Sequence, residues 1–187
     1  DGGDQAVVDH GGEGPGEQGG HQQRQPHVPE GLQLIGTEVS GRFVDVGREL
    51  SHARGALVVV DNTFLSPALQ RPIEHGADIV VHSTTKYLNG HSDVVGGAVI
   101  ARDATLHEEL AWWCNATGVP GAPFDSWLTL RGVRTLHARV RSHLENTAHV
   151  VEALLGHPAV SRVHYPGLAD HPGHALAKRQ QQGFGAI

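Results

Sequence analysis

Lysine is almost missing from this sequence of 187 residues. Fourteen residues are lysine or arginine, and only Lys86 and Lys178 are lysines. Arginine stays protonated in proteins, whereas the lysine amine can lose its proton and act as a nucleophile. A chain that places arginine at nearly every cationic position therefore directs attention to its remaining lysines. Lys86 stands in the stretch "VVHSTTKYLNGHSD", but its rarity alone identifies no function.

The sequence also lacks the features of several protein classes. The single cysteine, Cys114, cannot form a disulfide within the chain, which fits a reducing cytoplasm. A formal net charge of -6 provides no basic face, so we expect no nucleic-acid partner. No apolar run reaches membrane length, and we expect a soluble chain without a membrane partner. The 15 histidines lack the spacings that place metal ligands on one face, so we expect no metal site.

Residues 1–42 differ in composition from the rest of the chain. This segment is rich in glycine, glutamine and histidine; its first 41 residues hold eleven of the 25 glycines and no aromatic residue. Such a segment buries too little apolar surface to offset the entropy lost on ordering. We expect it to be largely disordered and to carry no site. A metal-handling or linker role for it is the less favoured alternative.

From residue 43 onward the pattern is typical of an α/β protein. Short β-branched runs predict buried strands, and apolar residues at helical spacing predict helices. The expected elements are a helix over 43–56, a strand over 56–64, a helix over 66–76 capped by Ser66, buried strands over 77–83 and 94–102, a helix over 103–118 with Cys114 buried, helices over 125–155 with a break near Gly132, a strand over 159–167 and a short helix over 171–183. This order predicts a layered α/β domain.

Side chains that could bind a ligand or react with it follow two of the predicted strands. Asp61 ends the first strand, while Ser83, Thr85 and Lys86 follow the next. Ligands of α/β sheets gather at the carboxyl ends of strands. At a strand end we expect Lys86 to be buried. Burial removes water from the amine and lowers its pKa, and the neutral amine can form an imine with an aldehyde. Hydroxyls suit a phosphate ester, and an aspartate can pair with a protonated pyridine nitrogen.

An aldehyde, a phosphate and a pyridine together describe pyridoxal phosphate. Two ordinary interpretations compete with this prediction. A strand-end aspartate is often only a turn or helix-capping residue. Most lysines lie on the surface and carry no chemistry.

The sequence around Lys86 resembles a known enzyme family. The stretches "VVVDNTFLSPALQRPIEHGA", "DIVVHSTTKYLNGHSDVVGG" and "AWWCNATGVPGAPFDSWLTLRGVRTL" are similar to those of the Cys/Met metabolism (transsulfuration) family of pyridoxal-phosphate-dependent enzymes. The resemblance extends from about residue 43 to residue 187. It implies a partial large domain of fold type I, like that of aspartate aminotransferase, over 43–158. The beginning of a C-terminal α+β domain would follow over 159–187.

The resemblance also implies roles for single residues. Lys86 matches the lysine that forms an imine with the cofactor, and Asp61 matches the partner of the pyridine nitrogen. Ser83 and Thr85 match the hydroxyls that bind the cofactor phosphate, while Thr63 matches a residue close to the ring. Asn89, Gly90 and His91 belong to the same signature, and we interpret them as turn formers that shape the lysine loop.

Within the family, "ELAWW" and "GVPGAPFDSWL" are most similar to the cystathionine γ-synthase branch. That likeness implies γ-replacement on an acylated homoserine by cysteine, with cystathionine as product. Cystathionine γ-lyase, methionine γ-lyase and O-acylhomoserine sulfhydrylase are alternatives, as is a catalytically inactive fragment. The family likeness further implies a homotetramer built from two dimers.

Several family features are not recognisable in this sequence. The ring-stacking tyrosine, the Gly-rich helix start, the Tyr/Arg pair and an asparagine-bearing loop should precede residue 43. The arginine that binds the substrate carboxylate should lie beyond the final "GFGAI". We therefore expect an internal fragment with weak or no turnover and a tendency to aggregate through open sheet edges. We also hypothesise that residues 1–41 derive from a shifted reading frame or a rearranged gene end.

Overall fold

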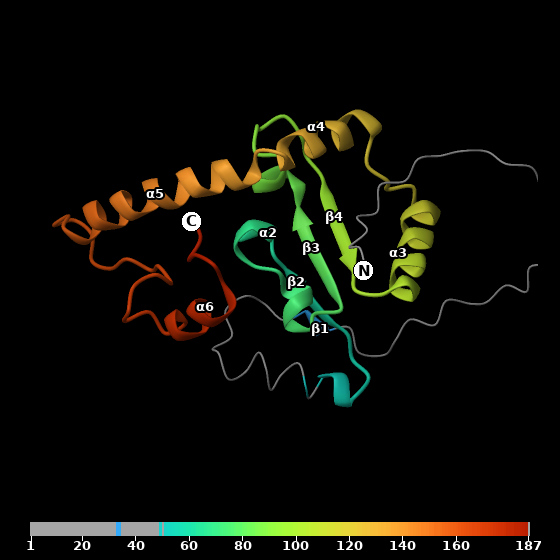
Figure 1. The fold of residues 1–187 in the computed structure, drawn as a ribbon, viewed down its shortest axis with the longest axis horizontal. Helices are drawn as coiled ribbons and strands as arrows, with labels where there is room; N and C mark the ends of the chain where they lie inside the picture. The colour runs from blue at the N-terminus through green and yellow to red at the C-terminus, as the bar shows by residue number, and fades with distance from the viewer. Residues whose placement is uncertain (1–32, 35–48, 50, 187) are drawn as a thin grey trace, which may run out of the picture.

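A four-stranded sheet forms the centre of the structure, a computed structural model that describes residues 33–34, 49 and 51–186. Its strands follow one another in chain order: β1 (Gln33–Leu34), β2 (Val58–Asp61), β3 (Ile79–Ser83) and β4 (Gly97–Ala101) (Figure 1). The first three strands are parallel, and β4 is antiparallel to β3. β1 lies within the segment predicted to be disordered. The remainder of that segment falls outside the described residues, so the expectation stays a prediction.

β2 and β3 hold the apolar interior of the sheet. Val58 and Val59 of β2 and Ile79 and Val80 of β3 are buried, as their β-branched runs predict. Backbone pairing sets Asp61 of β2 opposite Val81 of β3. Because the two strands are parallel, their carboxyl ends lie at the same edge of the sheet.

The connection between β2 and β3 contains two short helical pieces rather than the single helix predicted over 66–76. These pieces are α2 (Ser66–Leu69) and the 3₁₀ helix η1 (Pro72–His75). Pro72 has no N–H to donate, so the first helix ends before it. The predicted Ser66 cap is wrong by one residue, because the helix begins at Ser66 and its N-cap position is Leu65. The Ser66 Oγ still accepts a hydrogen bond from the Ala68 N–H at 3.3 Å.

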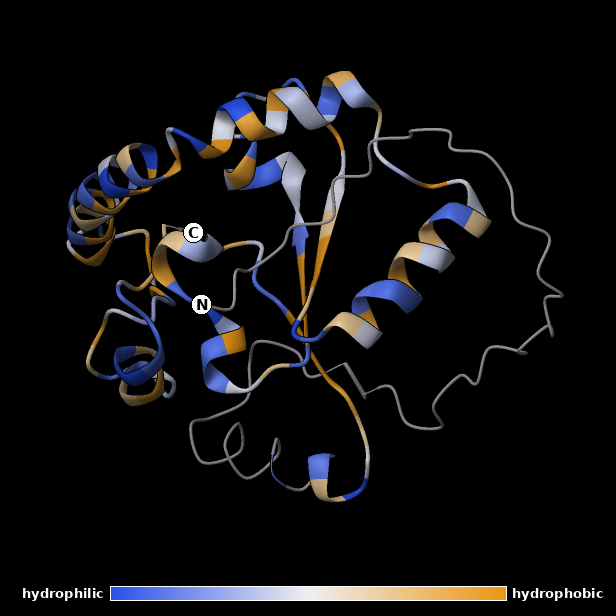
Figure 2. Ribbon diagram, turned by 45° about the vertical axis from the view of Figure 1, so that its right-hand side comes forward, coloured by the Kyte–Doolittle hydropathy of each residue, from blue (hydrophilic) through white to orange (hydrophobic). Residues whose placement is uncertain are grey.

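β4 corrects the prediction of a third buried strand. It is the outer strand of the described sheet, and Val99 at its centre is 41% exposed. Helix α3 (Ala104–Thr117) lies beside it, whereas α2 and α6 (His174–Gln180) lie on the other side of the strands (Figures 1 and 2). One neighbouring helix does not cover both faces of an edge strand, so its side chains stay partly in solvent.

The long helices agree with the sequence pattern. Asp103 caps α3 by accepting a hydrogen bond from the Leu106 N–H at 3.0 Å, and Gly118 ends it with φ +68°. Helices α4 (Pro123–Val133) and α5 (Leu136–Leu155) are separate, with the break close to Gly132 as predicted. None of the helices in the described part of the chain is long and apolar enough to cross a membrane.

Three smaller predictions have other outcomes. Of the helix expected over 43–56, residues 49 and 51–53 are helical, while 43–48 and 50 lie outside the described residues. The strand expected over 159–167 is wrong: no strand of the described sheet adjoins this segment to pair with its backbone. The prediction of a buried Cys114 is wrong: Cys114 is only partly buried, and α3 has no buried residue.

A small apolar cluster joins three elements beside the carboxyl edge of the sheet. It consists of Leu69 from α2, Leu88 from the segment after β3, and Leu136 and Val140 from α5. Burying a leucine or valine side chain contributes about 1.5–3 kcal/mol each. The cluster therefore anchors the segment that contains Lys86 to α5.

Asp78 organises the opposite end of the sheet. Its side chain, which belongs to a residue only 2% exposed, accepts hydrogen bonds from the Val58 N–H at 2.8 Å and from His52 Nε2 at 2.7 Å. Its other oxygen forms an ion pair with Arg102 at 2.6 Å. A single carboxylate thereby connects β2 to the segments on either side of it.

Candidate functional site

The predicted site residues Asp61, Thr63 and Ser83 lie together at the carboxyl edge of the sheet. Thr63 Oγ1 accepts a hydrogen bond from the Ser83 N–H at 2.8 Å. The Thr63 N–H in turn donates to Asp61 Oδ1 at 2.9 Å. These two bonds join the end of β2 to the end of β3. Thr63 is buried, whereas the Asp61 side chain is exposed to an incoming ligand.

Lys86 stands in a tight turn directly after β3. This turn, η2 (Thr84–Leu88), has π-helical hydrogen bonding but is kinked at Lys86, whose φ and ψ are -92° and -125°. The Asn89 N–H donates to Thr84 O at 3.0 Å, and the Gly90 N–H donates to Lys86 O at 2.8 Å. Gly90 has φ +73°, a conformation that favours glycine. We call residues 84–91 the lysine loop.

Asn89 and Gly90 act as turn formers, as the sequence predicts. Asn89 is 1% exposed, and its Nδ2 donates to Asp93 Oδ1 at 2.6 Å. The His91 Nδ1–H donates a hydrogen bond to Asn89 O at 2.7 Å, so His91 also belongs to the turn. These contacts close the loop on itself and leave the Lys86 side chain as its outward-facing amine.

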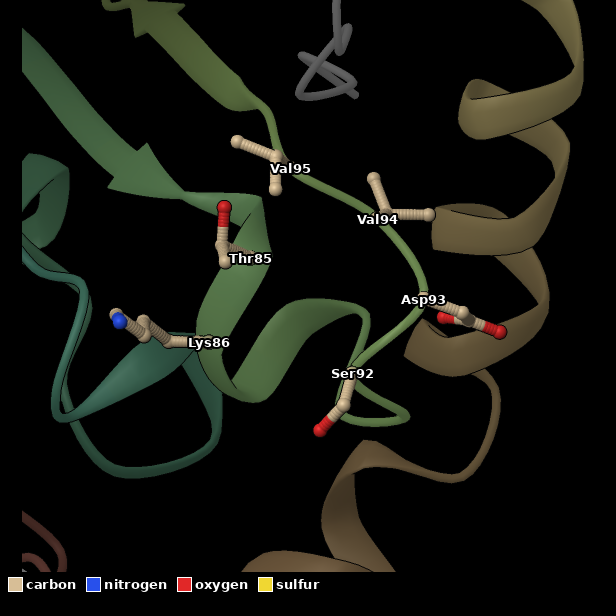
Figure 3. A pocket seen from close by; sticks show the side chains of 6 residues that line it. All are labelled: Thr85, Lys86, Ser92, Asp93, Val94 and Val95. Atoms are coloured by element: carbon tan, nitrogen blue, oxygen red, sulfur yellow. The ribbon is translucent and has the colours of Figure 1, made fainter.

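The Lys86 side chain is exposed, which corrects the prediction of a buried amine. It lines an open hollow together with Thr85 and the segment from Ser92 to Val95 (Figure 3). In Figure 3 the amine points away from Asp93 and Val94. The loop lies at the edge of the described sheet, and no described element packs over the amine to exclude water.

The two predicted phosphate-binding hydroxyls differ in their surroundings. Thr85 Oγ1 accepts a hydrogen bond from the Gly96 N–H at 3.0 Å and donates to Gly96 O at 3.4 Å. Ser83 Oγ forms no hydrogen bond within the described part of the chain. Ser83 therefore has its hydroxyl available to a ligand, whereas Thr85 uses its hydroxyl to close the turn towards β4.

His82 is buried next to the site without a partner for one ring nitrogen. The residue is 4% exposed, and its Nδ1 lacks a hydrogen bond among the described residues. Burial lowers the pKa of His82 below its ordinary value of 6.5, and the nearby Asp61 carboxylate opposes part of this shift. The folded chain therefore favours neutral His82.

This pKa shift predicts that the chain loses stability in mild acid. Between the lowered pKa and 6.5 the unfolded state binds more protons than the folded state, so the free energy of unfolding falls as the pH drops through this window. Above 6.5 the contribution is constant. Urea unfolding at several pH values should show a flatter profile for His82→Gln than for the parent chain. The exposed His149→Gln variant is the control, and a parent-like slope in His82→Gln contradicts the prediction.

Two residues that the sequence did not identify as site residues hold the lysine loop. Gly132 of α4 lies so close to the loop that a Cβ atom there would overlap Asn89 O and Leu88 O. Arg139 of α5 donates to Tyr87 O at 2.9 Å. The helix break near Gly132 was visible in the sequence, but a close approach between distant segments leaves no local signal.

The close approach predicts a measurable cost for a single added methyl group. Gly132→Ala should reduce the free energy of unfolding by about 1–3 kcal/mol, because helix α4 or the loop must shift to relieve the overlap. Urea denaturation measures the change. Gly156→Ala at the end of α5 is the matched control, since the nearest atom to its Cβ would lie 3.8 Å away. Equal stability of the two variants contradicts the prediction.

Comparison with solved structures defines the class of the protein. The structure of cystathionine γ-synthase from Xanthomonas oryzae pv. oryzae, in complex with aminoacrylate and cysteine, matches with a TM-score of 0.75 and 64% sequence identity. The match covers 76% of this chain and 37% of that one. The fold is thus a partial α/β domain of the pyridoxal-phosphate-dependent transferase type.

Sequence comparison identifies the family. The family model described as Cys/Met metabolism PLP-dependent enzyme matches residues 42–187, and the chain belongs to this family. Cystathionine γ-synthase of Mycobacterium tuberculosis is 55% identical over 139 residues, which are 74% of this chain and 36% of the relative. Cystathionine β-lyase of Coxiella burnetii is 48% identical over 149 residues, covering 78% and 38%. The chain spans little more than a third of the length of these relatives.

The residues present fit the cofactor of this family. Lys86 offers an exposed amine to an aldehyde, and Asp61 offers an exposed carboxylate to a pyridine nitrogen. Ser83 Oγ is free to donate to a phosphate. Thr85, with its hydroxyl already bonded to Gly96, is the least suited of the predicted ligands.

Proposed function

We propose that the protein catalyses γ-replacement on an acylated homoserine, with cysteine as the incoming thiol and cystathionine as product. The identity of 64% to the Xanthomonas oryzae pv. oryzae enzyme, whose structure contains aminoacrylate and cysteine, supports this assignment most strongly. The Coxiella burnetii β-lyase, at 48% identity, is less similar. Cleavage of cystathionine by a lyase is therefore the second candidate.

The site residues support distinct roles in this proposal. Pyridoxal phosphate, when bound, supplies an electron-accepting ring that stabilises negative charge on a substrate carbon. Lys86 would hold the cofactor aldehyde and, once displaced by the substrate amine, move protons at the α and β carbons. Asp61 would keep the pyridine nitrogen protonated, and Ser83 would hold the phosphate. Thr85 would join Ser83 by exchanging its bonds to Gly96 for one to the phosphate. Thr63, through its bonds to Asp61 and Ser83, would keep these groups in register.

A product assay tests the proposal. The chain, saturated with pyridoxal phosphate, is given an acylated homoserine with and without cysteine, and Lys86→Ala provides the blank. With cysteine we expect cystathionine and the released carboxylic acid; without it, water yields 2-oxobutanoate, ammonia and the acid. We expect slow turnover, so the ratio of products is the readout. In a parallel assay the chain is given cystathionine as the substrate. If this assay yields a keto acid while the first yields no cystathionine, the result supports a lyase instead.

Assembly, location and domain boundaries complete the proposal. The family likeness supports a homotetramer made of two dimers, in the cytoplasm, with a domain boundary near residue 158. Light scattering of the purified chain measures the mass of the assembly. Limited proteolysis locates the boundary.

A further inference from the structure

We propose that Arg139 is a positioning residue that fixes the lysine loop and thereby orients the Lys86 amine. The proposal rests on the role of Lys86 proposed above. Arg139 belongs to α5, 52 residues after Tyr87 of the loop, and contacts no predicted ligand of the cofactor. It acts on Lys86 only through the backbone of the residues that follow it.

The guanidinium of Arg139 bonds to the carbonyl oxygens at the end of the turn. Nη1 donates to Tyr87 O at 2.9 Å, and Nη2 lies 3.5 Å from Leu88 O. Tyr87 is the residue immediately after Lys86. Carbonyls at the end of a helical turn have no partner within the turn, so an outside donor satisfies them.

The same side chain also ties the loop to the junction of the long helices. Nη2 donates to Gly132 O at 2.8 Å, and Nε donates to Thr135 Oγ1 at 3.1 Å. One planar group thus connects the lysine loop, the end of α4 and the start of α5. Lysine, with a single nitrogen on a flexible stem, cannot reproduce this set of directions.

Two glycines make room for the guanidinium and the loop. A Cβ atom at Gly90 would overlap Arg139 Nη1, and one at Gly132 would overlap Asn89 O. Glycine at these two positions therefore allows the guanidinium and helix α4 to approach the loop closely. Burial lowers the pKa of Arg139, which agrees with a charge partly removed from water.

The apolar cluster lies directly beside the carbonyl groups that the Arg139 guanidinium bonds. Leu88 packs against Leu136 and Val140, one of which lies three residues before Arg139 and the other directly after it. Without the guanidinium, the Tyr87 and Leu88 carbonyls would lose their donor at a partly buried position. Loss of their donor should therefore let the turn open rather than merely lose one contact.

The test compares Arg139→Gln and Arg139→Lys with the parent chain and with Arg141→Gln. Arg141 lies on the same helix and is exposed, so it controls for loss of charge on α5. The first readout is hydrogen exchange of the Asn89 and Gly90 amides in cofactor-free protein. We expect exchange to rise about tenfold or more in Arg139→Gln, by less in Arg139→Lys, and not at all in Arg141→Gln.

The second readout separates positioning from simple stabilisation. With pyridoxal phosphate at saturating concentration, the rate and pH midpoint of imine formation at Lys86 are measured well below the melting temperature of each variant. We expect the rate in Arg139→Gln to fall about tenfold and the pH midpoint to move, with partial recovery in Arg139→Lys. If Arg139→Gln does not fold, Arg139→Lys carries the comparison on its own.

Two results would overturn the proposal: unchanged amide exchange, or an unchanged rate and pH midpoint in folded variants. Failure of the parent chain to form an imine at Lys86 refutes the proposed function instead. In that case amide exchange alone still decides whether Arg139 fixes the loop.

Discussion

Borohydride reduction of the 187-residue chain in the presence of pyridoxal phosphate is expected to attach the cofactor to Lys86 and not to Lys178. Both lysines are exposed, so accessibility does not distinguish them. Lys86 stands at the sheet edge beside Asp61 and Ser83, which suit the ring and the phosphate. Lys178 lies in the last turn of α6, far along the chain from such groups. Peptide mapping of the reduced protein identifies the labelled residue.

Replacing the reactive lysine should remove the adduct. Lys86→Arg retains the positive charge but has no amine that can form an imine, so the visible imine band and its loss on reduction should both disappear. Lys178→Arg is the matched control and should label like the parent chain. Labelling confined to Lys178 would disprove the role assigned to Lys86.

The second large effect is expected at the other end of the sheet. Asp78→Ala should lower the free energy of unfolding by about 1–3 kcal/mol, because it leaves the buried Val58 N–H without an acceptor. The Arg102 side chain is 44% exposed, so water solvates its charge and loss of the ion pair adds little. Urea denaturation, followed by circular dichroism, measures the loss.

Two further variants test whether the loss of stability comes from the Asp78 carboxylate. Asp78→Asn retains an oxygen for Val58 but not the charge that pairs with Arg102, so its stability should lie between those of the parent and the alanine variant. Glu74→Gln removes one partner of an exposed ion pair with Arg71 and should change stability by less than about 1 kcal/mol. An Asp78→Ala chain as stable as Glu74→Gln would show that the Asp78 carboxylate does not hold the sheet together.

The sequence predicts the parts of this structure that depend on local pattern. The β-branched runs locate β2 and β3, and the helix breaks at Gly118 and near Gly132 follow from glycine chemistry. Asp61 and Ser83 fall at neighbouring strand ends for the same reason, because parallel strands deliver their carboxyl ends to one edge. The family and its cofactor follow from the motif around Lys86, and the family model confirms them.

Contacts between distant segments could not be predicted in this way. Arg139 reaches the lysine loop across 52 residues, and Asp78 reaches His52 and Arg102 from between them. Neither side chain belongs to a periodic pattern or a turn signature. The exposure of Lys86 was also missed, because burial at a strand end depends on what packs above the sheet and not on the strand itself.

The closed lysine loop has a consequence for the chemical ageing of the protein. An asparagine followed by glycine loses ammonia when the glycine nitrogen attacks the asparagine side-chain carbonyl. Here the Gly90 nitrogen donates to Lys86 O, and the Asn89 amide is tied to Asp93. Deamidation at Asn89 should accordingly be slow in the folded chain and fast wherever the loop opens, so stored samples would preserve a record of how often it does.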